Sequence, residues 1–297
     1  MLSSTNFWMG LAGLVFLLAG VSVRRREISA ARGWEKLVAL GSVFIAVALA
    51  AFAPEHFLGP VFVRNMVPSW MPARPFWAYL VGCALLAAAT SFTVGKLVRL
   101  SSTLLGAMFF LFVCMIYLPS ALTHPTNRFA WTLVLRDLSF AAGAWAVAGL
   151  QSRASSPRRA QWLVLFGRLV VAIAAIFFGV QHFLHPEVSP GVPLRMTMPS
   201  WVPVPGVWAY LTGAILLAAG IGLALNWRSR TAAASIGALM TGLTLFLYLP
   251  VLLLARGGST PEINQALNYV ADTLLFAGAA LSLAAALPRD ADRADRT

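Results

Sequence analysis

The sequence predicts an all-α integral membrane protein of about nine transmembrane helices, with one N-terminal helix followed by two parallel four-helix repeats. Hydrophobic residues make up 59% of the 297 positions and charged residues 11%, and the mean hydropathy is +0.78. This composition is far from that of soluble domains. The apolar runs are long enough to cross roughly 30 Å of hydrocarbon, which takes about 20 helical residues. An internal repeat indicates how the helices are grouped.

The internal repeat centres on a Pro-Ser-Trp motif that occurs twice. Residues 68–88 and 199–219 lie 131 positions apart and are identical at 13 of 21 positions. The same spacing relates Tyr117-Leu118-Pro119 to Tyr248-Leu249-Pro250. Since each repeat holds an even number of helices, both copies enter the membrane from the same side. We therefore expect parallel repeats related by a pseudo-two-fold axis along the membrane normal.

The apolar segments divide the chain in order. The N-terminal helix and its basic loop occupy residues 1–33, and the absence of a basic leader and a cleavage site favours a retained anchor over a signal peptide. We expect the charged tail to be disordered. The remaining boundaries are a first module at 34–150, a basic connector at 151–161, a second module at 162–287 and the tail at 288–297. The predicted helices are residues 7–23, 36–53, 76–95, 101–122, 129–150, 162–181, 207–226, 232–254 and 266–287.

Basic residues indicate the orientation of the chain. The net charge of +12 comes mainly from arginines in short clusters between apolar runs, which is typical of the positive-inside rule rather than of nucleic-acid binding. Sixteen basic residues lie beside the loops after the odd-numbered helices, and five lie on the opposite side. The rule predicts an outer N-terminus and a cytoplasmic C-terminus in the bacterial inner membrane. The lipid bilayer is the expected partner, and nucleic acid is not.

Two histidines are the first candidate site. His56 and His182 are repeat partners, 126 positions apart, and all four histidines fall on the predicted outer side. Imidazole is a ligand of haem and metals and a hydrogen-bond partner for a quinone carbonyl. The alternative is that both histidines cap a helix end by bonding free carbonyls. No metal is predicted, because His182 and His185 form an H-x-x-H pair without a counterpart in the first copy, which leaves them weak candidates.

The aromatic and proline-rich loops are the second candidate. Proline restricts its own backbone and that of the preceding residue, so Pro-Ser-Trp-x-Pro predicts a stiff, extended lid ahead of a helix. The lid could cover an outward-facing pocket that stacks a flat cofactor, or its aromatic residues could form the ordinary interfacial belt. With the two histidines, the candidate cofactor-binding residues are Trp70, Trp201, Tyr79 and Tyr210.

Two acids within predicted helices are the third candidate. Asp137 and Asp272 are 135 positions apart, and similar apolar runs follow both. Intramembrane carboxylates are costly and suggest function, here as catalytic groups, proton carriers or quinone-headgroup partners. The alternative is a structural bond to a neighbouring helix. Arg136 precedes Asp137, but adjacent residues of a helix do not face each other, and Asp272 has no such neighbour.

The two cysteines favour no redox chemistry of their own. Cys83 and Cys114 form no C-x-x-C pair and are not repeated in the other module, so a thiol–disulfide relay is not expected. We expect both to be small buried apolar residues.

A four-helix module with a histidine-bearing outer loop and a proline before its second helix resembles the DoxX-like family. The second copy carries the segment G-x-x-L-L-A-A-G at 213–220, followed by Arg228 and Arg230. The resemblance covers roughly 36–150 and 162–287, as in a tandem fusion of two DoxX-like units. It implies a link to membrane oxidoreductase systems, such as a thiosulfate:quinone oxidoreductase subunit or assemblies that handle oxidative stress. Relatives often carry a glutamate where Tyr79 or Tyr210 stands here, so the role of that acid is not carried over.

These observations favour a membrane component of a redox or quinone-linked system, with quinone or haem as the cofactor and membrane or soluble redox proteins as partners. Parallel repeats also suit a small-molecule transporter, and a membrane scaffold without chemistry is the third hypothesis. The sequence leaves open the reaction, the substrate and whether the protein is an enzyme.

Overall fold

The structure is a computed structural model that describes residues 5–290, with the side chains of residues 60–62 left aside. Within this part of the chain there is no β-strand beyond one isolated bridge between Val188 and Thr197. Nine helical runs in the same part are long and apolar enough to cross a membrane. The prediction of an all-α membrane protein is confirmed. The end of the predicted tail, from residue 291, lies outside the described residues.

The helices follow the predicted order. The N-terminal elements are α1 (Thr5–Val23) and α2 (Arg25–Ala30). The first repeat contains α3 (Glu35–Ala39), α4 (Gly41–Leu58), α5 (Pro60–Met66), α6 (Arg74–Val94), α7 (Val98–Phe112), η1 (Val113–Tyr117), α8 (Leu118–Thr123) and α9 (Arg128–Ser152). The second repeat contains α10 (Pro157–Leu184), α11 (Pro205–Ala224), α12 (Ser229–Leu243), η2 (Thr244–Tyr248), α13 (Leu249–Leu254), η3 (Ala255–Gly257) and α14 (Thr260–Ala286).

Several helices are longer than the sequence predicts. The helix α4 continues through Pro54, because membrane helices tolerate an internal proline. The helix α14 begins six residues before its predicted start, behind a capping box in which Ser259 and Glu262 bond each other's backbone. Only residues 153–156 separate α9 from α10, so the connector is shorter than the predicted 151–161.

The two repeats match in fine backbone detail. Ala73 and Val204, which are 131 positions apart, both adopt a left-handed conformation, at φ 51° and 47°. Both repeats also have a π-helical turn in the middle of their third membrane run, η1 and η2, again 131 positions apart. Pro119 and Pro250 follow these turns. Because proline lacks an N–H and displaces the carbonyl of the preceding turn, a widened turn before it relieves the conflict.

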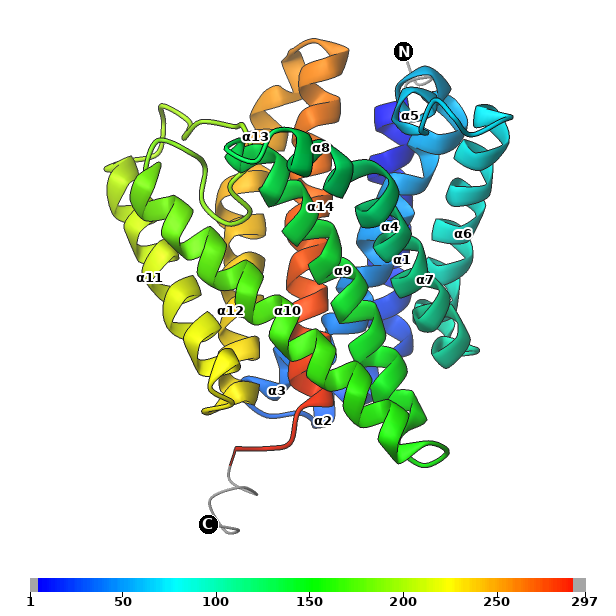
Figure 1. Ribbon diagram of the computed structural model, residues 1–297, viewed down its shortest axis with the longest axis vertical. Coiled ribbons are helices and arrows are strands. Elements are labelled where there is room, and N and C mark those ends of the chain that lie inside the picture. Colours follow the sequence, from blue (N-terminus) through cyan, green and yellow to red (C-terminus); the bar gives the residue numbers. More distant parts are fainter. Residues whose placement is uncertain (1–4, 291–297) are drawn as a thin grey trace.

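The two repeats interlock through their first and last helices. The first helix of each repeat packs along the last helix of the other, α4 on α14 and α10 on α9. The two last helices, α9 and α14, also contact each other at the centre of the bundle. Figure 1 shows α11 and α12 on one flank and α6 and α7 on the other, with α1 beside α4. Each four-helix unit is therefore completed by contacts with its partner unit.

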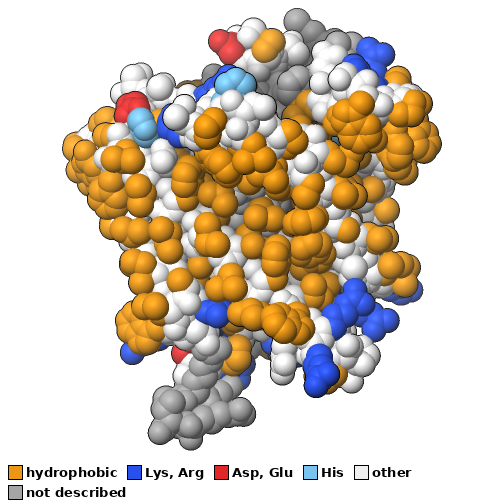
Figure 2. All heavy atoms as spheres, viewed as in Figure 1, with side chains coloured by type: hydrophobic (Ala, Val, Ile, Leu, Met, Phe, Trp, Pro, Cys, Tyr) orange, Lys and Arg blue, Asp and Glu red, His pale blue; other side chains and the backbone are white. Residues whose placement is uncertain are grey.

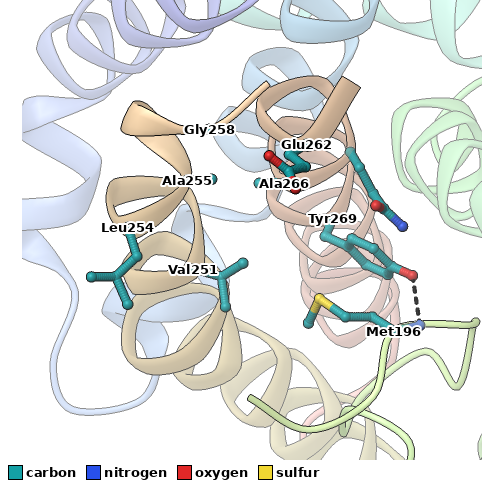
Figure 3. Close-up of a pocket in the computed structure, with 9 residues that line it drawn as sticks. Met196, Val251, Leu254, Ala255, Gly258, Glu262, Ala266 and Tyr269 are labelled. Carbon is teal, nitrogen blue, oxygen red and sulfur yellow. Dashed lines mark hydrogen bonds between the residues drawn. The ribbon is translucent and has the colours of Figure 1, made fainter. Parts of the chain in front are cut away.

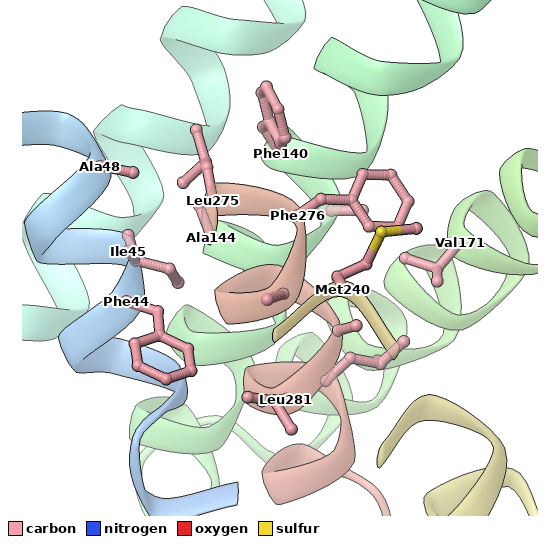
Figure 4. Packing of buried hydrophobic residues seen from close by; sticks show 14 of the residues in the cluster. Phe44, Ile45, Ala48, Phe140, Ala144, Val171, Met240, Leu275, Phe276 and Leu281 are labelled. Carbon is pink, nitrogen blue, oxygen red and sulfur yellow. The ribbon is translucent and has the colours of Figure 1, made fainter. Parts of the chain in front are cut away.

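The centre of the bundle is a continuous apolar core. Phe140 of α9 and Phe276 of α14 lie 6.4 Å apart between ring centroids, and both are buried. Small residues such as Ala144 and Ala48 fill the gaps between them and the neighbouring helices (Figure 4). Close approach of small residues is the main way in which helices associate in lipid.

The surface has an apolar band between two polar ends (Figure 2). We call the end with α5, α8 and α13 the outer end and the end with α2 and α3 the inner end, after the predicted orientation (Figure 1). At the inner end, Arg153 donates to Ala286 O, and Arg230 donates to Ala284 O and Leu287 O. Arginines of the predicted cytoplasmic set therefore also cap the last carbonyls of α14.

The expected burial of the cysteines is wrong. Cys83 on α6 and Cys114 on η1 are free and exposed on the outside of the bundle. Both lie on helices with apolar exposed faces, where a membrane protein meets lipid, so an apolar side chain need not be buried within the protein there.

Candidate ionic site between the two repeats

Three charged side chains meet where α9 and α14 face each other. Arg136 Nε donates to Asp137 Oδ2 at 2.9 Å, and Arg136 Nη2 lies 2.8 Å from the same oxygen. Arg136 Nη1 donates to Asp272 Oδ2 at 3.0 Å. One arginine thus joins the two predicted intramembrane acids, which are repeat partners. We call Arg136, Asp137 and Asp272 the ionic cluster.

The ionic cluster is buried within two membrane-spanning helices. The exposed fraction of the side chain is 13% for Arg136, 4% for Asp137 and 12% for Asp272. Charges at this depth are costly unless they are paired and hydrogen-bonded, and a guanidinium that binds two carboxylates meets that need. With both acids ionised, one negative charge remains uncompensated within the cluster.

One expectation about this region is wrong. Arg136 and Asp137 are adjacent in α9, and we expected their side chains to face apart. The long arginine side chain instead turns back to bind its neighbour and also reaches Asp272 on α14. Asp272, which has no arginine beside it in the sequence, obtains the same partner from the other repeat.

A close approach of the two helices lies one to two turns below the cluster. A Cβ added to Gly143 of α9 would lie 2.3 Å from the Cβ of Ala279 on α14. No side chain larger than hydrogen fits at Gly143 without moving the helices apart. This contact holds α9 and α14 at a separation that one arginine side chain can bridge.

Two aromatic rings lie against the arginine. The Cζ atom of Arg136 is 5.9 Å from the ring centroid of Tyr117 and 5.8 Å from that of Phe140. Both distances are within the range of cation–π attraction. Tyr117 is the last residue of the π-helical turn η1, and such turns often redirect a side chain at a functional site.

A second polar group, which sequence reasoning missed, lies outward of the cluster. Glu55 Oε1 of α4 accepts from Asn264 Nδ2 at 2.7 Å and from Asn268 Nδ2 at 2.9 Å, both on α14. Asn6 of α1 joins this group, because its Oδ1 accepts from Asn264 Nδ2 at 3.2 Å. Glu55 is 8% exposed. We call Glu55, Asn264, Asn268 and Asn6 the outer polar network.

The reason for the miss is the placing of two helix ends. The predicted helix of residues 36–53 ends before Pro54, which places Glu55 in a loop. The predicted start at residue 266 likewise left Asn264 outside a helix. With α14 starting at Thr260, Asn264, Asn268 and Asp272 fall at positions i, i+4 and i+8 on one face. Polar residues at every fourth position of an otherwise apolar helix are the sequence pattern that predicts such a network.

The two candidate histidines bond backbone groups. His56 Nδ1 lies 3.1 Å from Phe52 O, and His182 Nδ1 lies 2.6 Å from Phe178 O, each one turn back in its own helix. His182 Nε2 also accepts from Gly191 N at 3.0 Å. Both ring nitrogens of His182 are therefore engaged with backbone groups.

The loop after α10 enters the bundle and fills the outer end of the second repeat. Residues 188–194 are all buried. Tyr248 Oη donates to Pro190 O at 2.7 Å, and Arg128 Nη1 donates to Pro193 O at 3.1 Å. We call residues 188–194 the plug. The first repeat, whose loop is five residues shorter, has the helix α5 at the corresponding place.

The aromatic and proline-rich segments form turns rather than extended lids. Met71 N donates to Pro68 O and Val202 N donates to Pro199 O, both at 3.0 Å, which closes a tight turn in each repeat. Trp70 is 70% exposed and Trp201 44% exposed. This placement at the outer end is typical of an aromatic belt.

The candidate tyrosines pair with the residue that follows each histidine. Tyr79 stacks on Phe57, and Tyr210 stacks on Phe183, with ring centroids 6.2 Å and 5.8 Å apart. Both tyrosines are exposed, at 44% and 45%. The proposed role of these residues in cofactor binding stays a prediction. In the described part of the chain, the ring contacts of both tyrosines are with phenylalanines and not with the ionic cluster.

A surface pocket of about 360 Å³ lies between α13, η3, α14 and the segment that follows the plug (Figure 3). Its polar lining comes from Glu262, Gln265 and Tyr269, and its apolar lining includes Met196 and Leu254. Tyr269 Oη accepts from Met196 N at 2.9 Å, which closes the pocket on the inward side. Tyr269 also stacks on Tyr248 at 5.7 Å between ring centroids.

The weak metal-ligand candidates His182 and His185 have different partners. His185 Nδ1 lies 3.2 Å from Glu187 Oε1 at the surface, while the ring nitrogens of His182 bond backbone atoms. Among residues 5–290, no three histidine, cysteine or acidic side chains gather into a group that could hold a metal ion.

Comparison of the chain with known protein families, with curated proteins and with solved structures finds no match. The resemblance to the DoxX-like family therefore stays a prediction.

Proposed function

We propose that the protein is an integral membrane transporter for a small solute and that the ionic cluster is part of its binding site. The observation that carries this proposal is the meeting of two repeat-related acids on one arginine, within helices that span the membrane. Ionisable groups at this depth are costly and by default mark ion or solute pathways. Transporters built from repeats bind their solutes near the midplane, where the repeats meet.

The charge of the cluster favours a cation. Two carboxylates face one guanidinium, so a cationic solute, or a proton that accompanies a neutral solute, would restore neutrality. Arg136 would hold the two acids apart and orient their free oxygens, since a planar guanidinium fixes the carboxylates that it binds. Tyr117 and Phe140 supply rings that could also contact a cation.

The proposed orientation follows the distribution of basic residues. We place α5, α8, α13 and the N-terminus outside the cell and the C-terminus in the cytoplasm, in a bacterial inner membrane. The arginine-rich inner end of the bundle supports this orientation.

A redox or quinone-linked role, as implied by the DoxX-like resemblance, is the second proposal. Arg136 and Tyr117 offer hydrogen-bond donors at membrane depth, which a quinone carbonyl could accept. His182 gives this role less support than the sequence suggested, because both of its ring nitrogens already bond backbone groups.

The transport proposal is tested by uptake into proteoliposomes. Purified protein is reconstituted and offered radiolabelled cationic, zwitterionic and anionic solutes in turn. We expect uptake of at least one cationic or proton-accompanied solute, and we expect Asp272→Asn to reduce it at least tenfold. The matched control is Glu187→Gln, the same chemical change at an exposed acid outside the cluster. Uptake that Asp272→Asn leaves intact would remove the cluster from the transport pathway.

The redox proposal is tested on the same preparation. Solvent extraction and an optical spectrum show whether quinone or haem copurifies in stoichiometric amount. If quinone copurifies with the wild type and is lost from an Arg136→Gln variant, the redox role is favoured over transport. Protein without quinone, haem or any transported solute would favour a scaffold.

A further inference from the structure

The outer polar network continues the ionic cluster outward along one face of α14. Asn264, Asn268 and Asp272 follow one another at one-turn intervals, and Glu55 bonds the first two from α4. Asn268 also donates to Asn264 O and lies 3.1 Å from Asn264 Oδ1. At the outer end, Asn6 Nδ2 donates to Thr260 O at 2.9 Å. Polar side chains thus follow α14 from its first residue to the ionic cluster.

The buried carboxyl group of Glu55 has no cationic partner within the part of the chain that the structure describes. The guanidinium of Arg136 binds Asp137 and Asp272, and in the described part of the chain no ion pair reaches Glu55. Three carboxyl groups therefore share one cationic side chain in this part of the bundle. A buried carboxylate without a counter-ion is costly even when amides donate to it, so a positive charge should accompany it.

The groups around Glu55 do not suit a metal ion. Its Oε1 already accepts two amide donors, and the residue is 8% exposed, between α1, α4 and α14. A metal cation would need several oxygen ligands, whereas the amide groups present N–H donors to the carboxylate. The occupant that this geometry accepts is a proton.

The second repeat has lost the acid. The repeat partner of Glu55 is Gln181, 126 positions later and directly before His182. Gln181 is 9% exposed, and its buried Oε1 has no hydrogen-bond partner among the described residues. At the 135-residue spacing of the two aspartates, Phe129 and Leu133 stand where Asn264 and Asn268 stand on α14. The acid of α4 and its amides on α14 therefore meet at the α4–α14 contact and have no counterpart at the equivalent α10–α9 contact.

We propose that Glu55 is a proton-binding residue that exchanges protons between the outer side and Asp272, along the contact between α4 and α14 only. A proton from outside water forms an O–H bond with the Glu55 carboxylate. It later leaves Glu55 for the Asp272 carboxylate, directly or through water, so that Glu55 is again an anion and Asp272 is neutral. The inference rests on the proposed function in one respect, because it names the proton as the ion coupled to solute movement.

Among the interactions of the described residues, few charged or titratable groups reach Glu55. His56 lies beside it on α4, and Asp272 interacts with it electrostatically from α14. Arg136 and Asp137 lie beyond Asp272 on α9. The helix α1 presents uncharged residues, Asn6 and Met9, to the network.

Infrared spectroscopy tests the proposal without a known solute. Oriented proteoliposomes with a strongly buffered interior are exposed to outer buffers of stepwise lower pH, and the band of protonated carboxyl groups is recorded. We expect a band that grows as the outer pH falls and that loses one component in Glu55→Gln. Glu187→Gln, a matched change at an exposed acid, should keep the component. A Glu55→Gln spectrum equal to that of the wild type, from folded protein, overturns the proposal.

A second measurement needs no variant of Glu55. Dicyclohexylcarbodiimide reacts with protonated carboxyl groups in apolar surroundings, and the modified peptide is identified by mass spectrometry. We expect modification of wild-type Glu55 that decreases at least tenfold from mildly acidic to alkaline outer pH. Labelling of Glu55 that is absent or independent of pH overturns the proposal. Proton binding at Glu55 in a protein that moves no solute would keep this inference and overturn only the transport proposal.

Discussion

The outer halves of the two repeats begin from the same sequence pattern and end in different chemistry. In the first repeat, Glu55 is bound by the amides of Asn264 and Asn268. In the second repeat, the corresponding Gln181 has an unpartnered oxygen, and the plug fills the bundle beside it. The special backbone conformations are the same in both repeats, because each has a π-helical turn and left-handed residues at equivalent positions.

The difference teaches how a duplicated membrane module can become asymmetric. Five additional residues between the histidine and the Pro-Ser-Trp motif are enough to let the second loop enter the bundle. His182, Tyr248 and Tyr269 then hold it by bonds to its backbone or to the segment that follows. The first repeat keeps a polar route beside α14 that ends at the ionic cluster. We infer a polar outer half in the first repeat and an outer half filled by the plug in the second.

The largest expected effect is the loss of the arginine that joins the repeats. Arg136→Leu leaves Asp137 and Asp272 buried without a cation, and breaking such a network costs about 3–5 kcal/mol. Thermal unfolding in detergent should show a large fall in the midpoint. The triple variant Arg136→Gln/Asp137→Asn/Asp272→Asn should recover much of the loss, since no charge is left unpaired. An Arg136→Leu protein as stable as the wild type would contradict the assigned pairing.

The contact below the cluster should be almost as sensitive. Gly143→Ala places a Cβ 2.3 Å from that of Ala279, and forcing the helices apart should cost about 2–3 kcal/mol. Gly242→Ala on α12 is the control, because an added Cβ meets nothing within 4 Å there. We expect this control to be neutral or stabilising, since alanine favours a helix by about 1 kcal/mol over glycine. Equal midpoints for the two variants would show that α9 and α14 do not approach this closely.

The repeat-related histidines sharpen the comparison between the two halves. His182→Ala leaves the Gly191 N–H without its partner at a buried site, which should cost about 1–3 kcal/mol. His56→Ala removes one bond at a less buried position and should cost about 1 kcal/mol or less. Limited proteolysis should cut the segment of residues 186–198 faster in the first variant only. Equal stability and equal cleavage of both variants would mean that His182 does not hold the plug.

The smallest expected effects concern the features that the repeats share. Ala73 and Val204 both precede a helix with positive φ, which costs a non-glycine residue about 1–2 kcal/mol. Ala73→Gly and Val204→Gly should each stabilise the protein by about 1 kcal/mol or less. Glycine removes the strain of positive φ, but it loses more backbone entropy on folding than other residues do. Paired thermal unfolding measures both changes. Opposite signs at the two positions would show that the turns are not equivalent.

The architecture and the two acids of the ionic cluster could be predicted from the sequence. Hydropathy and the 131-residue spacing predicted nine helices in two repeats, because each membrane helix must satisfy its own backbone within an apolar run. Asp137 and Asp272 were found for the same reason, since a carboxylate in such a run is conspicuous. Their meeting on Arg136 could not be predicted, because it depends on which helices cross at the centre and on the reach of one long side chain.

The position of Glu55 and the burial of the plug could not be predicted, because proline and polar loop residues are compatible with more than one local structure. A proline such as Pro54 usually marks a helix end in soluble proteins, but α4 continues past it. The sequence therefore did not predict that Glu55 lies within a helix. The plug contains Ser189, three prolines or glycines and only a few apolar residues, a composition typical of an exposed loop. Its burial depends on tertiary bonds from Tyr248 and His182, which a single sequence does not reveal.

The most direct test of this difference between the outer halves compares thiol access at the two repeat-related positions. Glu55→Cys and Gln181→Cys are made separately in a Cys83→Ala/Cys114→Ala background, and a small water-soluble thiol reagent is added from the outer side. Glu55 and Gln181 are equally buried, at 8% and 9% exposed, so static burial does not favour either position. The account predicts labelling at position 55 at least ten times faster than at position 181. Equal rates, or faster labelling at 181, would contradict the proposed asymmetry.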